Sequence, residues 1–278
     1  MLLLVDLDGV VYRGPVPVPG VAEVLQRRVT LGDRVVYVTN NSRSHREEYR
    51  ARLEQVGVPL GDDPDSSIVT AARATAVLLS EAQPPAQLAM VFGGPGLAQE
   101  LGDVGIRTVS PTEAGLAAEP DTLVVGVDFK LTYQRLSIAA ECVRRGARFW
   151  ATNRDAIYPG AERLLAGAGS MVAAVAYATG REPDMVVGKP EPRLFEAAAE
   201  MAGVPVAEAI VIGDNLFTDI GAARAVGARS VLMLTGVTSR AEAEGASKES
   251  WPTAVAHDAA ELEQALERLT RTEQAAAG

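Results

Sequence analysis

Two pairs of aspartates have the residue type and spacing for chemistry. Asp6 and Asp8 stand at the end of one apolar run, and Asp214 and Asp219 follow another. If these runs are strands, the acids lie at the carboxyl ends of an α/β sheet, where ligands bind. Carboxylates this close repel one another without a cation, which favours Mg²⁺, an ion that prefers one or two carboxylates with water and phosphate oxygens. Taken alone, an Asp-Gly turn would also explain Asp8, and a helix dipole would explain Asp219.

Two further polar groups follow apolar runs. Thr39, Asn40, Asn41 and Ser42 stand together before a helical pattern. Their hydroxyl and amide groups, with the N–H groups of the next helix, suit a phosphate dianion; the alternative is helix capping, for which Asn and Ser are favoured. Lys189 ends another run among glycine and proline residues, where its ammonium would offset charge on a phosphoryl group and on a nucleophilic carboxylate.

These groups need elements that bring them together. Apolar runs rich in Val and Ile alternate with helical patterns, which predicts an α/β fold with parallel sheets and crossover helices. Gly57, Gly146, Gly203 and Gly227 each stand where a helix needs a left-handed residue after its last turn. The expected strands are 2–5, 35–38, 88–92, 123–127, 148–151, 185–187, 209–212 and 230–234. The expected helices are 21–29, 45–56, 70–80, 132–145, 170–178, 193–202, 217–226 and 259–269.

Prolines suggest how the chain divides into domains. Proline fixes its own φ and keeps the preceding residue out of the helical region, so the segments at Pro84 and Pro183 predict hinges. We expect residues 84–183 to form an inserted α/β domain, and residues 1–83 and 184–278 to build one sheet together. The alternative is a single continuous sheet with these prolines in ordinary loops.

Composition excludes several classes of protein. With 278 residues, 47% hydrophobic and 22% charged, the chain is typical of a globular protein and not of a disordered or disulfide-stapled one. The 26 basic and 36 acidic residues give a net charge of −10, so we expect neither nucleic acid nor an anionic membrane as a partner. Cys142 is the single cysteine, and the apolar start is too short for a signal or a membrane span. We expect a cytoplasmic protein.

The order of the four polar groups narrows the function. Asp-x-Asp-Gly from Asp6, Thr-Asn-Asn-Ser from Thr39, Gly-Lys-Pro around Lys189 and Gly-Asp-x-x-x-Thr-Asp from Gly213 each end an expected strand. Together they resemble the four motifs of the haloacid dehalogenase (HAD) superfamily. The resemblance implies a Rossmann-like HAD core with a parallel sheet and a large inserted α/β cap, in agreement with the hinges above.

The local sequence also resembles one branch of that superfamily. The matching stretches are similar to the NagD-like, 4-nitrophenylphosphatase-like hydrolases of subfamily IIA, and the resemblance covers nearly the whole chain. These stretches are 6–14, 19–20, 38–43, 178–180 and 186–190.

The resemblance implies catalytic and metal-binding roles. Asp6 is the nucleophile that forms an aspartyl-phosphate, and Asp8 is the acid that protonates the leaving alcohol and then activates water. Superfamily dehalogenases lack this second aspartate, so phosphate transfer is the better expectation. Asp6, the backbone carbonyl of Asp8 and the Asp214 side chain would hold Mg²⁺, with Asp219 in support.

The resemblance also implies how the substrate binds. Thr39, the Asn40 backbone and Lys189 would bind the phosphoryl oxygens, and Lys189 would also serve catalysis. Loops beside the site choose the leaving group, although a solvated polar loop is an equal interpretation of Arg154 and Asp155. The residues expected to contact the substrate are Asn41, Ser42, Arg43, Asn153 and Asp155.

The expected partner is a small-molecule phosphate ester. Sugar or polyol phosphates are favoured because the cap loop around residues 152–155 is polar rather than aromatic; phosphoglycolate, nucleotides and 4-nitrophenyl phosphate stay open. The alternatives are a non-catalytic phospho-ligand-binding paralogue and a phosphorylated signalling module, although motif order and the long insertion disfavour the latter. Relatives can also form a homodimer through the cap.

Overall fold

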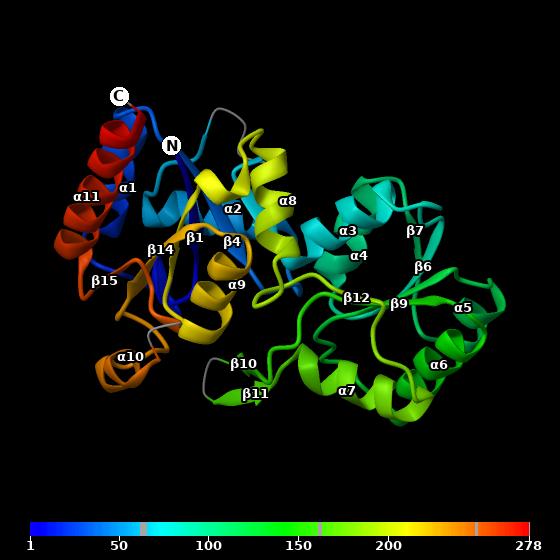
Figure 1. The fold of residues 1–278 in the computed structure, drawn as a ribbon. Helices are drawn as coiled ribbons and strands as arrows, with labels where there is room; N and C mark the ends of the chain where they lie inside the picture. The colour runs from blue at the N-terminus through cyan, green and yellow to red at the C-terminus, as the bar shows by residue number, and fades with distance from the viewer. Residues whose placement is uncertain (62–65, 161–162, 248–249, 278) are drawn as a thin grey trace. The chain divides into compact units, whose positions relative to one another are not determined.

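The apolar run near the N-terminus forms strand β1 (Leu2–Asp6), in which every residue is buried. The same sheet contains β4 (Arg34–Thr39), β5 (Ile68–Thr70), β13 (Ile210–Gly213), β14 (Arg229–Met233) and β15 (Ala254–Ala256). In this computed structural model the strand order is β15-β14-β13-β1-β4-β5 (Figure 1). Strand β1 pairs in parallel with β13 and with β4, and burial on both faces is typical of such a central strand.

Contacts along the chain define two compact units, called unit 1 and unit 2 below. The segment Thr39–Tyr49, which carries the predicted phosphate-binding residues, groups with unit 2, while the domain bounds expected from the prolines stay a prediction. Unit 1 comprises Met1–Val38, Arg50–Ile68 and Lys189–Gly278, and unit 2 comprises Thr39–Tyr49 and Val69–Gly188. The structure describes residues 1–61, 66–160, 163–247 and 250–277.

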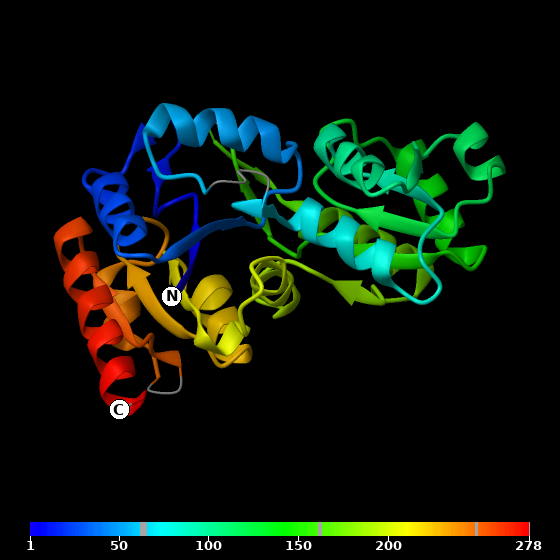
Figure 2. The ribbon, with the colours of Figure 1, turned by 90° about the horizontal axis from the view of Figure 1, so that it is seen from above.

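Helices of unit 1 flank its sheet. Helices α1 (Val21–Thr30) and α11 (Ala259–Ala277) lie side by side in Figures 1 and 2, and Arg27 of α1 donates to both carboxylate oxygens of Glu263 in α11. Helix α2 (Arg46–Val56) begins in unit 2 and ends in unit 1. The remaining elements are hairpin β2 (Tyr12–Arg13) and β3 (Val16–Pro17), α8 (Arg193–Met201), η2 (Val206–Glu208), η3 (Leu216–Ile220), α9 (Gly221–Ala225) and α10 (Arg240–Gly245).

The helix expected over 217–226 differs in the structure. Its first part, η3, is a π-helix, and only Gly221–Ala225 is α-helical. The Asn215 side chain accepts from the N–H groups of Phe217 and Thr218, and the Asn215 carbonyl accepts from Ile220 five residues on. Such a wide turn adds one residue to the helix and is frequent at functional sites. Here it contains the buried Asp219.

Unit 2 has its own parallel sheet, of order β12-β9-β8-β6-β7. The strands are β6 (Leu88–Phe92), β7 (Arg107–Val109), β8 (Thr122–Val125), β9 (Arg148–Ala151) and β12 (Met185–Val186). All four adjacent pairs are parallel, so the expected α/β fold with parallel sheets is confirmed. The other elements are α3 (Ala71–Glu81), α4 (Pro95–Asp103), α5 (Glu113–Ala117), α6 (Tyr133–Arg144), α7 (Ala168–Thr179) and the hairpin β10 (Ile157–Pro159) and β11 (Leu164–Ala166).

The core of unit 2 is apolar, and alternate residues of its strands point into it. Phe92, Leu123 and Phe149 from three neighbouring strands pack with Ile138 of α6 and Val172 of α7.

Within the part of the chain that the structure describes, no helix combines the length and the apolar character that a membrane span requires.

A buried ion network ties the start of α2 to α4 inside unit 2. Glu100 of α4 is fully buried, accepts a 3.0 Å hydrogen bond from the Arg46 backbone N–H and contacts the Arg46 guanidinium. The same guanidinium lies 2.8 Å from Asp103, and Asp103 is 3.0 Å from His45 Nε2. His45, Glu100 and Asp103 are close enough to hold a metal, but the Arg46 charge already lies among them. We therefore interpret the group as structural.

Replacing Glu100 tests this network. Glu100→Gln leaves the buried Arg46 charge without its closest carboxylate, so we expect the free energy of unfolding to fall by about 3 kcal/mol. Urea unfolding at neutral pH measures the change. Glu141→Gln, which removes the exposed Glu141–Arg145 pair, is the matched control and should cost less than about 1 kcal/mol. Equal losses for both variants would contradict the structural role of Glu100.

Candidate active site

A buried lysine bridges two carboxylates in unit 1. Lys189 follows β12 and Gly188, and its Nζ donates a 2.6 Å hydrogen bond to Asp219 Oδ1 and a very short one to Asp6 Oδ1. Only 3% of the Lys189 side chain is exposed. Burial alone would lower the pKa of Lys189, but the negative charges of Asp219 and Asp6 outweigh it and raise the pKa above its ordinary value. The lysine is therefore charged at neutral pH.

Three acids converge beside this lysine. Asp6 ends β1, Asp214 follows the adjacent strand β13, and Asp219 lies in η3. One oxygen from each carboxylate lies within 4.8 Å of the other two, and all three residues are buried. Asp219 Oδ2 also accepts a 3.1 Å hydrogen bond from the Asn215 N–H, so each of its two oxygens has a donor of its own. Three of the four predicted acids, Asp6, Asp214 and Asp219, thus form one cluster, which does not include Asp8.

Glycines leave the space that Asp214 occupies. A Cβ atom at Gly9 would lie 2.2 Å from Asp214 Oδ2, and one at Gly236 would lie 1.8 Å from it. Gly9 also has φ +88°, which side-chain-bearing residues rarely adopt. The Val237 N–H donates a 2.6 Å hydrogen bond to Asp214 Oδ2, and the Thr235 hydroxyl donates one of 2.6 Å to the Gly9 carbonyl. Backbone therefore wraps closely around this carboxylate.

Two of these acids, Asp6 and Asp214, have raised pKa values. Burial raises the pKa of Asp6 well above its ordinary value; Lys189 opposes this rise, and the charges of Asp219 and Asp214 add to it. Burial and the charge of Asp219 raise the pKa of Asp214 to about 7. Excess buried negative charge of this kind is what a divalent cation offsets.

Asp8 lies on the turn that follows β1. Burial raises its pKa, while the positive charges of Arg52 and Lys189 oppose the rise. Arg52 lies over the Tyr12 ring, 3.4 Å from the ring centre, and Tyr12 forms an isolated bridge with Asp8. A carboxyl group with a raised pKa is suited to donating a proton near neutral pH.

The other predicted residues form a polar cluster within unit 2. Asn40 Nδ2 donates to Asp155 Oδ1 at 3.0 Å and to Oδ2 at 3.1 Å, and the Asn40 carbonyl accepts from Asn153 Nδ2 at 2.8 Å. The Ser42 hydroxyl lies 2.9 Å from that of Thr152. These contacts join the loop after β4 to the loop after β9.

Thr39 stabilises the start of the loop after β4. Thr39 is buried at the end of β4, and its hydroxyl accepts a 3.2 Å hydrogen bond from the Asn41 N–H. The preceding residue, Val38, is the register partner of Asp6 in the sheet. Thr39 and Asn40 are therefore one and two residues beyond the position that pairs with the predicted nucleophile.

An aromatic and cationic group adjoins the polar cluster. The Arg43 guanidinium lies 4.6 Å from the centre of the Phe129 ring, and that ring meets Tyr158 edge to face with centroids 5.3 Å apart. Asn41 Nδ2 lies 3.4 Å from the Tyr158 hydroxyl, to which it donates. Phe129 is 52% exposed. The predicted residues Asn41 and Arg43 therefore contact aromatic side chains, Tyr158 of strand β10 and Phe129 of the loop after β8.

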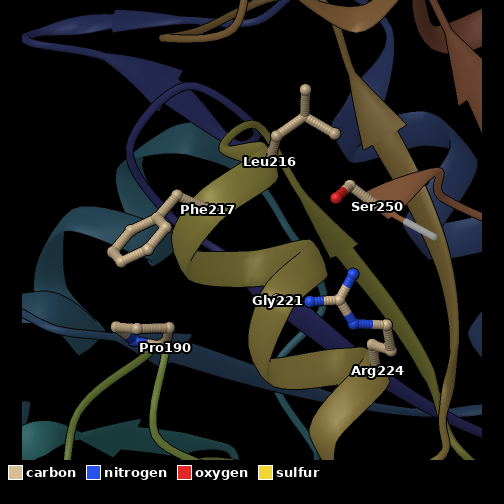
Figure 3. A pocket seen from close by; sticks show the side chains of 6 residues that line it. All are labelled: Pro190, Leu216, Phe217, Gly221, Arg224 and Ser250. Carbon is tan, nitrogen blue, oxygen red and sulfur yellow. The ribbon is translucent and has the colours of Figure 1, made fainter. Parts of the chain in front are cut away.

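A separate cavity of about 410 Å³ lies in unit 1 beside η3 (Figure 3). Pro190 and Phe217 are on one side of it and Arg224 and Ser250 on the other. Leu216 and Gly221 complete its lining, and none of the predicted catalytic residues contributes.

The structure brings the predicted residues together in two groups. Asp6, Lys189, Asp214 and Asp219 meet in unit 1, with Asp8 on the adjoining turn; the second group is Asn40, Asn41, Ser42, Arg43, Asn153 and Asp155 in unit 2, with Thr39 at its start. Sequence reasoning missed Thr235, Gly236 and Val237, which contact Gly9 and Asp214. Their position directly after an expected strand was the signal that could have found them.

Comparisons with known proteins agree with the geometry. A family model described as haloacid dehalogenase-like hydrolase matches residues 3–107, and one described as HAD-hydrolase-like matches residues 186–262. The chain is 37% identical to D-glycerol 3-phosphate phosphatase of Mycobacterium tuberculosis over 94% of its own length and 70% of that protein. The chain belongs to the haloacid dehalogenase-like hydrolases.

Other similar members of this hydrolase family are also phosphatases. The chain is 34% identical to acid sugar phosphatase of Staphylococcus epidermidis, covering 90% of this chain and 92% of that protein. The p-nitrophenyl phosphatase from Archaeoglobus fulgidus superposes with a TM-score of 0.85 at 31% identity, covering 95% and 98% of the two chains. A glycerol phosphate phosphatase from M. tuberculosis in complex with magnesium gives 0.83 at 36% identity, covering 95% and 76%. The predicted HAD-type phosphatase class and capped HAD fold are confirmed.

Ionisation of Asp214 should destabilise the metal-free hydrolase. Its pKa is about 7 in the folded state and 3.8 ordinarily, so between these values the folded chain binds more protons than the unfolded chain. Stability therefore falls as pH rises through this window. In EDTA, we expect Asp214→Asn to be more stable than the wild type at about pH 8, by on the order of 2–4 kcal/mol.

Thermal unfolding in EDTA at about pH 5 and about pH 8 measures this effect. The gain from Asp214→Asn should shrink at the lower pH, whereas Glu54→Gln, at an exposed position of the same unit, should show no such trend. A gain that does not depend on pH would contradict the raised pKa of Asp214.

Proposed function

We propose that this chain is a Mg²⁺-dependent phosphomonoesterase that hydrolyses phosphate esters of small metabolites through an aspartyl-phosphate on Asp6. The observation that carries the proposal is the buried Lys189 that bonds both Asp6 and Asp219 at the carboxyl edge of a parallel sheet. A lysine held there keeps Asp6 from carrying an uncompensated charge and provides a positive charge for a phosphoryl group.

The residues fit a Mg²⁺ ion. Asp6 and Asp214, with the backbone carbonyl of Asp8, would hold it, and Asp219 would support the site through Lys189 and Asn215. The donors are oxygens, as Mg²⁺ requires. Because Gly9 and Gly236 have no side chains, their backbone lies close to the Asp214 carboxylate. When bound, the ion neutralises charge on the transferring phosphoryl group.

Each residue then has a part in a double displacement. Asp6 attacks phosphorus and forms a P–O bond, while the ester P–O bond breaks and Asp8 gives its proton to the leaving oxygen. Asp8, now a carboxylate, takes a proton from water as that water attacks phosphorus and releases Asp6. Lys189, the Thr39 hydroxyl and the Asn40 N–H are the proposed donors to the phosphoryl oxygens, whose charge they stabilise.

The substrate class follows from the relatives and from the second polar group. The named relatives act on glycerol phosphate, sugar phosphate and p-nitrophenyl phosphate, and we propose the same class of compact ester here. Asn41, Ser42 and Arg43 are proposed to face the leaving group. Arg43 supplies a positive charge there, and the neighbouring Phe129 supplies an exposed apolar surface.

Replacement of the nucleophile is the first test of this function. We expect the wild type to release phosphate from glycerol 3-phosphate, sugar phosphates and 4-nitrophenyl phosphate with Mg²⁺ and not with EDTA. Asp6→Asn should lower kcat by about 10⁴-fold or more, because no covalent intermediate forms. Circular dichroism confirms that the variant is folded. Metal-dependent hydrolysis at the wild-type rate by Asp6→Asn would refute the assigned nucleophile.

Replacement of the proposed acid gives a second, different signature. Asp8→Asn should lower kcat/KM for glycerol 3-phosphate by about 10²- to 10⁴-fold, because an alkoxide needs a proton to leave. The loss in the first displacement should be smaller for 4-nitrophenyl phosphate, since nitrophenolate is a good leaving group. Rapid-mixing measurement of nitrophenolate release separates that step from water attack. An equal loss for both esters in this step would argue against Asp8 as the acid.

A further inference from the structure

Asn40 is held at both of its polar ends by one loop of unit 2. Its side-chain Nδ2 donates to both carboxylate oxygens of Asp155, at 3.0 and 3.1 Å, and its backbone carbonyl accepts from Asn153 Nδ2 at 2.8 Å. Asn153 and Asp155 are themselves linked, because the Asp155 N–H donates a 3.0 Å hydrogen bond to Asn153 Oδ1. The loop after β9 thus holds the Asn40 side chain and the carbonyl of the peptide between Asn40 and Asn41.

This junction is closely packed. Asn153 is 4% exposed and Thr152 is fully buried. The Gly188 N–H donates a 2.7 Å hydrogen bond to the Thr152 carbonyl. A Cβ atom at Gly188 would lie 2.7 Å from Asn40 Oδ1, from Asn153 Cβ and from the Thr152 carbonyl oxygen alike. Asn40 therefore has little room to turn, and its backbone carbonyl and side-chain amide are bonded by residues more than a hundred positions away.

We propose that Asn153 and Asp155 are positioning residues that hold Asn40, and with it the phosphate-binding backbone after β4, instead of contacting the leaving group. The inference rests on the proposed function, in which the Asn40 N–H binds a phosphoryl oxygen. Asn153 orients the peptide that follows Asn40 by bonding its carbonyl, and Asp155 keeps the Asn40 side chain on the side of the β9 loop. The Asp155 carboxylate then has the Asn40 side-chain amide as its donor.

Positioning and leaving-group contact predict different kinetic patterns. If Asp155 acts through Asn40, its loss lowers kcat/KM by the same factor for every substrate, because all substrates share the phosphoryl group. If Asp155 contacts the leaving group, its loss changes the ratio of kcat/KM between substrates. Inorganic phosphate, which has no leaving group, separates the two cases most directly.

The experiment compares Asp155→Ala and Asp155→Asn with the wild type. Asp155→Ala should lower kcat/KM by about 10- to 100-fold for glycerol 3-phosphate, phosphoglycolate and 4-nitrophenyl phosphate alike, a loss typical of a small misplacement. Calorimetry with Mg²⁺ should show weaker binding of inorganic phosphate. Asp155→Asn keeps an acceptor for Asn40 and should recover most of both losses.

Two further variants complete the test. The double variant Asn40→Ala and Asp155→Ala should lose no more kcat/KM than the more damaging single variant, because both changes remove the same Asn40–Asp155 hydrogen bonds. Arg154→Ala removes only the neighbouring exposed pair with Glu182 and serves as the matched control. Melting temperatures show that each variant is folded.

Two results would overturn the positioning role. One is a kcat/KM ratio between substrates that changes by more than about threefold in Asp155→Ala. The other is unchanged binding of inorganic phosphate. A wild type that binds phosphate without turning over any ester would refute the proposed function alone, since the calorimetric comparison would still decide the part played by Asp155.

Discussion

Three buried carboxylates lie close together in unit 1, and one buried lysine bonds two of them; much of the structure serves this arrangement. Lys189 offsets one negative charge, so Asp6, Asp214 and Asp219 together carry more charge than it can balance. The raised pKa values of Asp6 and Asp214 express this excess. Such a cluster is stable when it holds a proton or a second cation, because an uncompensated buried charge costs several kcal/mol. The excess charge that a proton or a cation would offset therefore comes from the protein's own residues.

The backbone around the cluster is adapted to the acids and not to core packing. Parallel pairing of β1 with β13 places Asp6 and Asp214 at the same edge of the sheet. Gly213 leaves room for Asp219, since a Cβ atom there would lie 2.2 Å from Asp219 Cβ, and the π-helix η3 contains that acid. Glycine inside a strand ordinarily weakens it, so its presence here is explained by the carboxylates beside it.

The sequence predicted what depends on local pattern. The parallel sheets follow from apolar runs, and Gly57, Gly146, Gly203 and Gly227 all have the positive φ expected at helix ends. Strand-end acids and Lys189 were predictable because parallel strands place their carboxyl ends together. Partners far apart in the chain were not. Nothing local to Asn40 indicates a bond to a residue 115 positions away, and the short β10–β11 hairpin has too few residues to show a period.

The contacts of Asn153 and Asp155 change how the substrate preference should be sought. A polar loop after β9 favoured sugar or polyol phosphates while its side chains were assumed to face the ligand. In the structure two of these side chains bind Asn40, so their polarity is accounted for inside the protein. Elsewhere in unit 2, the exposed ring of Phe129 has Arg43 over its face and Tyr158 at its edge. The polarity of the loop after β9 is therefore no evidence by itself for a polyol over another leaving group, because the Asn40 contacts already explain it.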